Sequence, residues 1–154
     1  MIKRGVYAAG LSVLNTDRTL NIEATIKHAS QAIQNGLHGV FFFGSTGQSQ
    51  LISTNEKKEL ITKIAIHKLR NQFFLGTGNN SLNENIDLIS YAMEYNFKEF
   101  LIMPPAYYKG NTDEGVFDFY SRLIKVIPKV KIILYNFEKL SGYKFSAEMV
   151  ANLV

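Results

Sequence analysis

Cysteine and tryptophan are absent from this chain of 154 residues, and proline occurs only three times. Without cysteine the chain has no disulfide bond, no thiolate nucleophile and no cysteine-based metal site. This fits a cytoplasmic protein, and we predict that location. The stretch that follows Lys3 and Arg4 is superficially similar to a signal peptide. However, Asn15, Thr16 and Asp17 stand where small cleavage-site residues would follow, so we predict no secretion.

The sequence also lacks long apolar runs and clusters of one charge. No apolar run approaches the roughly 20 residues of a membrane-spanning helix, so we expect no membrane partner. The 17 lysines and arginines contribute to a formal net charge of +4, but no basic run is longer than the pair Lys57–Lys58. A nucleic-acid-binding surface needs clustered basic residues, and we therefore exclude nucleic acid as a partner.

Metal-ligand spacing is missing as well. His28, His38 and His67 are isolated from one another in the sequence, and the aspartates form no recognisable carboxylate pair. We therefore predict no metal site and no organic cofactor.

Apolar residues make up 46% of the chain, which is enough for one sizeable core. Five apolar, β-rich runs predict strands over Gly5 to Ser12, Gly39 to Phe43, Phe73 to Gly76, Glu99 to Met103 and Lys131 to Tyr135. Each run is followed by a helical period; the helices are expected from about Asn21, from an N-cap within Thr54 to Lys57, over Leu82 to Tyr95, from about Asp113, and from Ser146. We predict one domain over residues 1–154, with no internal boundary.

The repeated unit is a strand followed by a helix, about 30 residues long, which is typical of a parallel α/β architecture. A complete (β/α)₈ TIM barrel needs roughly 250 residues. The chain is therefore expected to supply about the first five βα units of such a barrel. In this arrangement we expect Phe41, Phe43 and Ile133 on the inner face of the sheet.

Polar loops follow the second, fourth and fifth strands, and a parallel sheet brings such loops to one edge, where ligands bind. The loop from Gly44 to Ser49 offers backbone N–H groups and three hydroxyls, which suit a small carboxylate or phosphate. The alternative is a tight turn whose hydroxyls bond only to the protein.

Tyr135 ends the fifth strand, two residues after Ile133. If Ile133 points into the barrel, the Tyr135 phenol lies at its mouth, where it could relay a proton with Ser45 as the second hydroxyl. The alternative is a rim tyrosine that packs with its ring and leaves its hydroxyl in water.

Three motifs in this order resemble the dihydrodipicolinate synthase and N-acetylneuraminate lyase family of pyruvate-dependent aldolases. They are Gly44-Ser45-Thr46-Gly47, Pro104-Pro105-Ala106-Tyr107-Tyr108-Lys109-Gly110 and Ile133-Leu134-Tyr135-Asn136. The resemblance covers essentially the whole chain.

The resemblance implies a division of roles among these residues. Ser45 and Thr46 would hold the carboxylate of pyruvate, with Gly47 in the same substrate-binding loop. Ser45 and Tyr135 would share a proton relay that Tyr107 completes in a neighbouring subunit, and the adjacent Tyr108 is a possible substitute. The family also implies self-association into dimers or tetramers.

The chain departs from the family pattern at several places. Gln48 stands where the family usually has glutamate, and Leu140 stands where dihydrodipicolinate synthases have an arginine that grips the second substrate. The family's imine-forming lysine lies on strand six, which is not among these residues. Lys109 and Lys139 are poor substitutes because they are expected on solvated loops.

Two functions follow as expectations. The first is a Schiff-base-forming pyruvate or 2-oxo acid aldolase, lyase or synthase of which this chain lacks the strand-six lysine. The second is a catalytically incompetent half-barrel that binds a small anion or serves as an assembly module.

Overall fold

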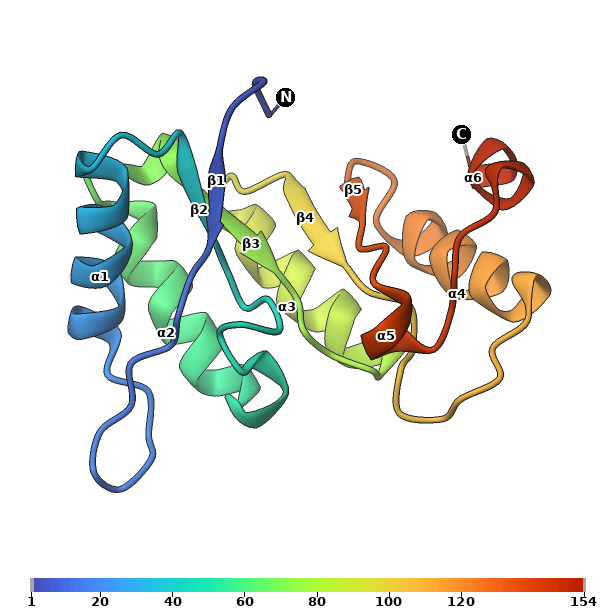
Figure 1. Ribbon diagram of the computed structural model, residues 1–154, viewed down its shortest axis with the longest axis horizontal. Coiled ribbons are helices and arrows are strands. Elements are labelled where there is room, and N and C mark those ends of the chain that lie inside the picture. Colours follow the sequence, from blue (N-terminus) through green and yellow to red (C-terminus); the bar gives the residue numbers. More distant parts are fainter. Residues whose placement is uncertain (1, 154) are drawn as a thin grey trace.

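The fold is described from a computed structural model that covers residues 2–153. Its centre is a parallel sheet of five strands in the order β1-β2-β3-β4-β5, so each strand pairs with its sequence neighbour (Figure 1). The strands are β1 (Tyr7–Ala9), β2 (Gly39–Phe42), β3 (Phe73–Gly76), β4 (Glu99–Ile102) and β5 (Lys131–Leu134). Strand order and direction are those of the first five units of a (β/α)₈ barrel, and the predicted fold class is confirmed.

The connections between strands are helical. The α-helices are α1 (Ile22–Gln34), α2 (Thr54–Ala65), α3 (Leu82–Glu94), α4 (Asp113–Val126), α5 (Glu138–Ser141) and α6 (Ala147–Leu153). Two short 3₁₀ turns, η1 (Ser49–Leu51) and η2 (Arg70–Gln72), precede α2 and β3. None of the helices among residues 2–153 combines the length and the apolar character that crossing a membrane requires.

All the predicted strands and helices are present; β3 has the predicted bounds, and the other four strands are shorter than predicted. The first strand begins at Tyr7 and ends at Ala9, whereas the sequence predicted Gly5 to Ser12. The helix α5 was not predicted, because four residues carry no measurable helical period.

Phe43 is a second correction. It was expected to continue β2 on the inner face, but the strand ends at Phe42 and Phe43 takes a left-handed φ of 61°. This turn breaks the alternation of the strand, and the Phe43 ring is buried.

Side-chain caps determine where the first four helices begin. Each cap accepts a backbone N–H bond from the first helical turn, and the caps are Asn21, Ser53, Ser81 and Thr112. Ser53 lies one residue before the segment predicted to hold the cap, and Glu56 completes a capping box with it. Glu56 also accepts a bond of 2.7 Å from the backbone N–H of Leu20, so this helix start is tied to the loop before α1.

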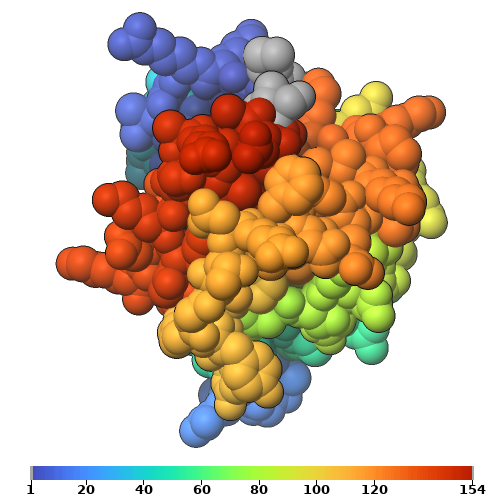
Figure 2. All heavy atoms as spheres, turned by 90° about the vertical axis from the view of Figure 1, so that its right-hand side faces the viewer, coloured from blue at the N-terminus to red at the C-terminus, as the bar shows by residue number. Residues whose placement is uncertain are grey.

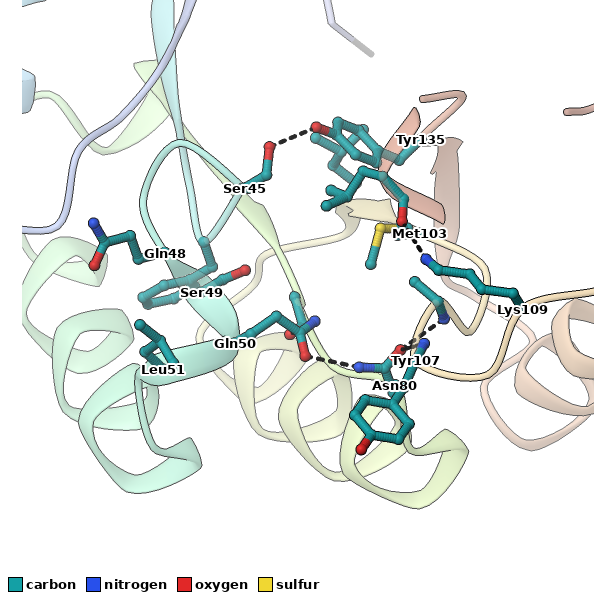
Figure 3. Close-up of a pocket in the computed structure, with 16 residues that line it drawn as sticks. Ser45, Gln48, Ser49, Gln50, Leu51, Asn80, Met103, Tyr107, Lys109 and Tyr135 are labelled. Atoms are coloured by element: carbon teal, nitrogen blue, oxygen red, sulfur yellow. Dashed lines mark hydrogen bonds between the residues drawn. The ribbon is translucent and has the colours of Figure 1, made fainter. Parts of the chain in front are cut away.

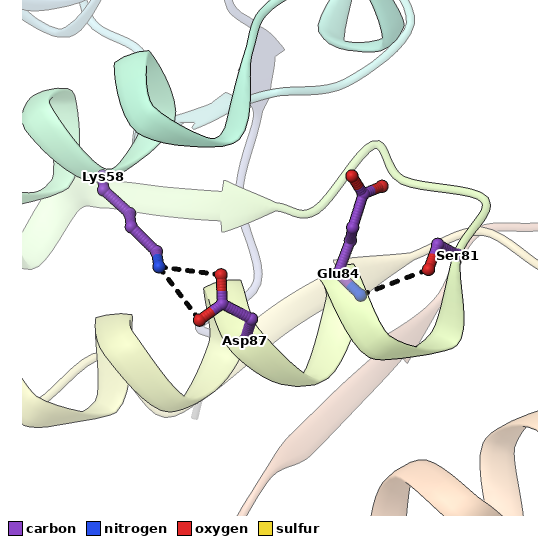
Figure 4. A network of polar contacts seen from close by, with 4 residues as sticks. All are labelled: Lys58, Ser81, Glu84 and Asp87. Carbon is purple, nitrogen blue, oxygen red and sulfur yellow. Dashed lines mark hydrogen bonds and ion pairs between the residues drawn. The ribbon is translucent and has the colours of Figure 1, made fainter.

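Helices α2 and α3 lie side by side and are joined by an ion pair. Lys58 Nζ lies 2.7 Å from Asp87 Oδ2 (Figure 4). At the start of α3, away from this pair, Ser81 Oγ accepts a bond from the Glu84 N–H. The C-terminal helix α6 packs against α4. Figure 2 shows α6 against α4, and the Tyr143 hydroxyl donates a 2.7 Å bond to Asp113 at the start of α4.

The two faces of the sheet differ in burial. Strand residues that face the helices form the core, and among the most buried are Val40, Phe42, Leu75, Phe100 and Ile102. The alternate residues form the inner face: Tyr7, Phe41, Phe74, Leu101 and Ile133. All five are only partly buried. The rings of Phe41 and Phe74 stack at 5.1 Å, so this open face is lined by aromatic groups.

Lys57 is a charged residue inside the core. Its side chain on α2 is 1% exposed, and its ammonium donates to the Thr77 carbonyl at 2.9 Å and to Asn79 Oδ1 at 2.7 Å. The Phe43 ring centroid lies 5.9 Å from the same nitrogen. Burial lowers the pKa of Lys57 to about 8, and the charge of Glu84 acts against this effect.

We predict that the contribution of Lys57 to stability depends on pH. Because its pKa is about 8 in the fold and 10.5 ordinarily, the folded protein loses this proton at a lower pH than the unfolded chain. Relative to Lys57→Met, the wild type should gain stability from pH 8 to pH 10, by about 2 kcal/mol. Urea unfolding of both proteins between pH 6.5 and pH 10 measures the difference. A difference that stays constant over this range would show that Lys57 titrates normally.

We also predict that the 154-residue chain, expressed by itself, associates through the open inner face. Apolar surface left in water costs about 25 cal/mol per Å², so pairing of two such faces is favourable. The double variant Phe41→Thr/Ile133→Thr should be more monomeric than the wild type in sedimentation analysis. Ile66→Thr is the control, because Ile66 is 86% exposed outside the sheet. Equal association of all three proteins would assign the contact to another surface.

Candidate functional site

A cavity of about 420 Å³ opens at the carboxyl edge of the sheet (Figure 3). Leu101 of β4 and the segments that follow β2, β3, β4 and β5 supply its lining: Phe43, Gly44, Ser45, Gln48, Ser49, Gln50, Leu51, Gly78, Asn80, Leu101, Met103, Ala106, Tyr107, Lys109, Tyr135 and Leu140. This is the edge at which parallel α/β sheets bind their ligands.

The side chains of Ser45 and Tyr135 come together at the mouth of this cavity. Their hydroxyl oxygens lie 2.8 Å apart and share a hydrogen bond, in which either group can be the donor (Figure 3). Ser45 follows β2 and Tyr135 follows β5, and two strands separate them in the sheet. In a flat sheet, three strand spacings would separate the backbones of β2 and β5 by about 14 Å. The curvature of the sheet therefore brings this pair together.

The direction of Ser45 depends on the turn that follows β2. Phe43 with φ 61° and Gln48 with φ 51° are both left-handed, a conformation that costs a non-glycine residue roughly 1 kcal/mol or more. Between them, the Gln48 N–H donates to the Ser45 carbonyl at 3.0 Å. The loop is thus a compact turn that presents Ser45 toward Tyr135.

Thr46 and Gly47 lie in the same loop but do not line the cavity. Thr46 is exposed, whereas Gly47 is buried and contacts the residues that follow β1. The Gly47 carbonyl accepts a 2.6 Å bond from Ser12 Oγ, and a Cβ at Gly47 would lie 2.7 Å from the Gly10 carbonyl oxygen. Glycine is required here for packing, and the substrate-binding role of both residues stays a prediction.

Asn80 joins three of the loops around the cavity. Its Oδ1 accepts bonds from the backbone N–H groups of Ala106 (2.7 Å) and Tyr107 (3.1 Å). Its Nδ2 donates to Gln50 Oε1 at 2.7 Å, and Gln50 in turn donates to the Gly78 carbonyl at 2.6 Å. Sequence reasoning missed this residue; its only signal was an asparagine pair in the loop that follows a buried strand.

Tyr107 and Tyr108 project from the loop after β4. Their side chains are 77% and 82% exposed, and their rings contact each other edge to face at 5.0 Å. Tyr107 lines the cavity. No bond joins either hydroxyl to Ser45 or Tyr135 among the contacts of residues 2–153, so the predicted third member of the relay is not assembled within one chain.

Most of the chain matches the model of one protein family, the dihydrodipicolinate synthetase family, over residues 3–154. A 4-hydroxy-tetrahydrodipicolinate synthase of Methanothrix thermoacetophila is 27% identical over 150 residues, which are 97% of this chain and 50% of that protein. The chain spans about half the length of the curated relatives that it matches.

Solved structures agree with this result. Dihydrodipicolinate synthase from Agrobacterium tumefaciens superimposes with a TM-score of 0.90 at 28% identity, over 98% of this chain and 54% of that one. The Acinetobacter baumannii dihydrodipicolinate synthase, crystallised in complex with pyruvate, gives 0.83 at 25% identity, over 97% and 51% of the two chains. Sequence and structure therefore lead to the same conclusion, that this chain belongs to the dihydrodipicolinate synthetase family.

Proposed function

We propose that this chain is the 2-oxo-acid-binding part of a class I aldolase, lyase or synthase that holds pyruvate or a related 2-oxo acid as an imine. The hydrogen bond between Ser45 and Tyr135 carries the proposal. It joins two hydroxyls at the mouth of a cavity whose size suits a small molecule. The pyruvate complex of the Acinetobacter baumannii relative supports the ligand class.

In this proposal the chain supplies proton transfer and orientation. Imine formation expels a hydroxyl as water, and that hydroxyl must receive a proton. Tyr135 donates it, and the proton that the attacking nitrogen releases returns to Tyr135 through Ser45, because the two oxygens already share one hydrogen bond. The loop of Ser45, Thr46 and Gly47 binds the carboxylate, and Tyr107 or Tyr108 of a second subunit completes the relay.

The nucleophile is proposed to be a lysine on a sixth strand, outside these residues. Lys109 and Lys139 are both exposed. Lys109 donates to the Leu140 carbonyl at 2.8 Å, so its nitrogen is engaged with the backbone. The buried Lys57 contacts Thr77 and Asn79 and does not line the cavity.

Borohydride trapping with pyruvate tests the proposal. In a form that includes strand six, intact-mass analysis should show the mass of one reduced pyruvate adduct, and residues 1–154 alone should show none. An adduct on Lys109 or Lys139 of the 154-residue chain would contradict this assignment. The rival function, a half-barrel that binds a small anion, predicts binding of pyruvate with no adduct in either form.

We predict that Tyr135→Phe lowers the turnover of the longer form by about 10² or more, the usual effect of losing a general acid or base. The ring and its packing remain, so thermal unfolding should change little. Steady-state kinetics of the purified variant decide the outcome. Near-normal turnover in a folded variant would remove Tyr135 from the mechanism.

A second prediction concerns the carboxylate loop. Thr46→Val should weaken pyruvate binding by roughly 1 to 3 kcal/mol, because a bound carboxylate loses a hydroxyl donor. Titration calorimetry of the 154-residue chain measures this change. Thr62→Val on α2 is the matched control, since Thr62 bonds Tyr91 on the outer helices. If both variants bind pyruvate equally well, the exposed Thr46 hydroxyl does not contact the ligand.

A further inference from the structure

Asn80 connects the loop after β3 to the loop after β4, which carries Tyr107 (Figure 3). Its Oδ1 accepts from two successive backbone N–H groups, those of Ala106 at 2.7 Å and Tyr107 at 3.1 Å. Within residues 2–153, no backbone carbonyl accepts from the N–H groups of residues 106–111. Because Ala106 is buried, its N–H has little access to water as a substitute. The Asn80 oxygen is therefore the backbone anchor of this loop.

A second pair of bonds fixes the orientation of the Asn80 amide. Its Nδ2 donates to Gln50 Oε1 at 2.7 Å, and Gln50 Nε2 donates to the Gly78 carbonyl at 2.6 Å. Since the Gln50 oxygen accepts from Asn80, the amide group of Asn80 cannot turn around without losing this bond. The Asn80 oxygen is thus kept directed at the loop after β4.

The segment that carries Asn80 is held from behind by two buried side chains. Lys57 of α2 is 1% exposed and donates to Asn79 Oδ1 at 2.7 Å. Asn85 of α3 is fully buried, and its Nδ2 donates to the Asn79 carbonyl at 3.1 Å. Apolar side chains at these two positions would avoid the cost of removing polar groups from water. The contacts are better explained by the position that they give to Asn80 than by stability.

Tyr107 depends on this anchor for its direction. Its side chain is 77% exposed, and its ring contacts the equally exposed ring of Tyr108. With so little packing, the position of the phenol follows from the backbone, which is held at the Tyr107 N–H itself. In the proposed function this phenol acts in a second subunit, and a displacement of about 1 Å can lower a rate by about 10².

We propose that Asn80 is a positioning residue for the reaction of the neighbouring subunit. By holding the loop after β4, it sets the point from which Tyr107 reaches the other active site. The inference rests on the proposed function, which assigns Tyr107 to the relay of a second subunit. In this role Asn80 acts through Tyr107 and touches no reacting atom.

Hydrogen exchange of the 154-residue chain, read by mass spectrometry, tests the anchor. Prolines at positions 104 and 105 have no N–H, so a peptide of residues 103–108 reports the amides of residues 106–108. Asn80→Leu should speed the exchange of this peptide about tenfold or more, while peptides of α3 and β4 keep their rates. Asn80→Asp should stay close to the wild type, because a carboxylate oxygen also accepts two N–H bonds.

Two further variants complete the exchange experiment. Gln50→Met removes the partner of the Asn80 Nδ2 but keeps the oxygen, so it should speed exchange less than Asn80→Leu does. Asn83→Leu is the matched control, because Asn83 is an exposed asparagine of α3, and no hydrogen bond within residues 2–153 joins it to this loop. It should exchange as the wild type does.

Mixed subunits of the form that includes strand six test the effect on the reaction. The readout is the rate of borohydride-trapped adduct formation with pyruvate. Asn80→Leu should lower the limiting rate about tenfold or more and leave the half-saturating pyruvate concentration within about twofold, because the loop of Ser45 is unchanged. Asn80→Asp should restore most of the rate.

Co-expression of Asn80→Leu with Tyr135→Phe then separates action within a subunit from action on its neighbour. In a mixed pair, the Asn80→Leu subunit has an intact Tyr135 and receives a well-placed Tyr107. About half of the Asn80→Leu subunits should therefore be trapped at the wild-type rate, since random pairing places half of them beside a Tyr135→Phe subunit. The two variants differ in mass, so intact-mass analysis shows which subunit carries the adduct.

The outcomes separate the two proposals. Equal exchange in the wild type and Asn80→Leu would overturn the inference, and so would a mixed pair in which the Asn80→Leu subunit stays slow. The proposed function stands in both cases, because the wild type still forms the adduct. If the longer wild-type form gives no adduct with pyruvate, the proposed function fails, and the role of Asn80 fails with it.

Discussion

Burial of one face of a curved parallel sheet is the constraint on which the other features depend. Val40, Phe42, Leu75, Phe100 and Ile102 need a helix layer, and the right-handed crossovers of a parallel sheet supply it on that side only. The same connectivity places the carboxyl ends of all five strands at one edge of the sheet. The cavity exists because four polar loops are forced to meet there, and its position is a product of packing rather than of any single motif.

Polar groups behind the cavity turn this packing into a defined geometry. Lys57 links α2 to the loop after β3 through Thr77 and Asn79, and Asn80 carries the connection to the loop after β4. Two hydrogen bonds, to Thr77 and Asn79, offset only part of the cost of burying the ammonium, since burial still lowers the pKa of Lys57 to about 8. Thr77 Oγ1 and Asn79 Nδ2 are buried beside it without a hydrogen-bond partner in the described structure. These buried polar contacts fix the positions of the segments behind the cavity but add little to the stability of the fold.

The sequence predicts the sheet well, since continuous apolar runs such as β2 are distinctive and each of the first four helices begins at a capping residue. It also predicts that Tyr135 and Ser45 lie at one edge, because Tyr135 shares the face of Ile133 and both residues occupy motif positions. The left-handed turn at Phe43 escapes prediction because local propensity does not favour it. Burial of Lys57 escapes for a similar reason: a lysine in a helix is expected in water, and only the tertiary contacts with Thr77 and Asn79 reverse this.

The bond between Ser45 and Tyr135 has a mechanical meaning as well as a chemical one. It is a chord across the arc formed by β2, β3, β4 and β5, and it joins the two ends of that arc directly. A ligand that replaces one hydroxyl as the partner of the other removes the chord. The curvature of the sheet is then held by the strand ladders and helices alone. A ligand that binds to either hydroxyl therefore competes with the direct link between the segments that follow β2 and β5.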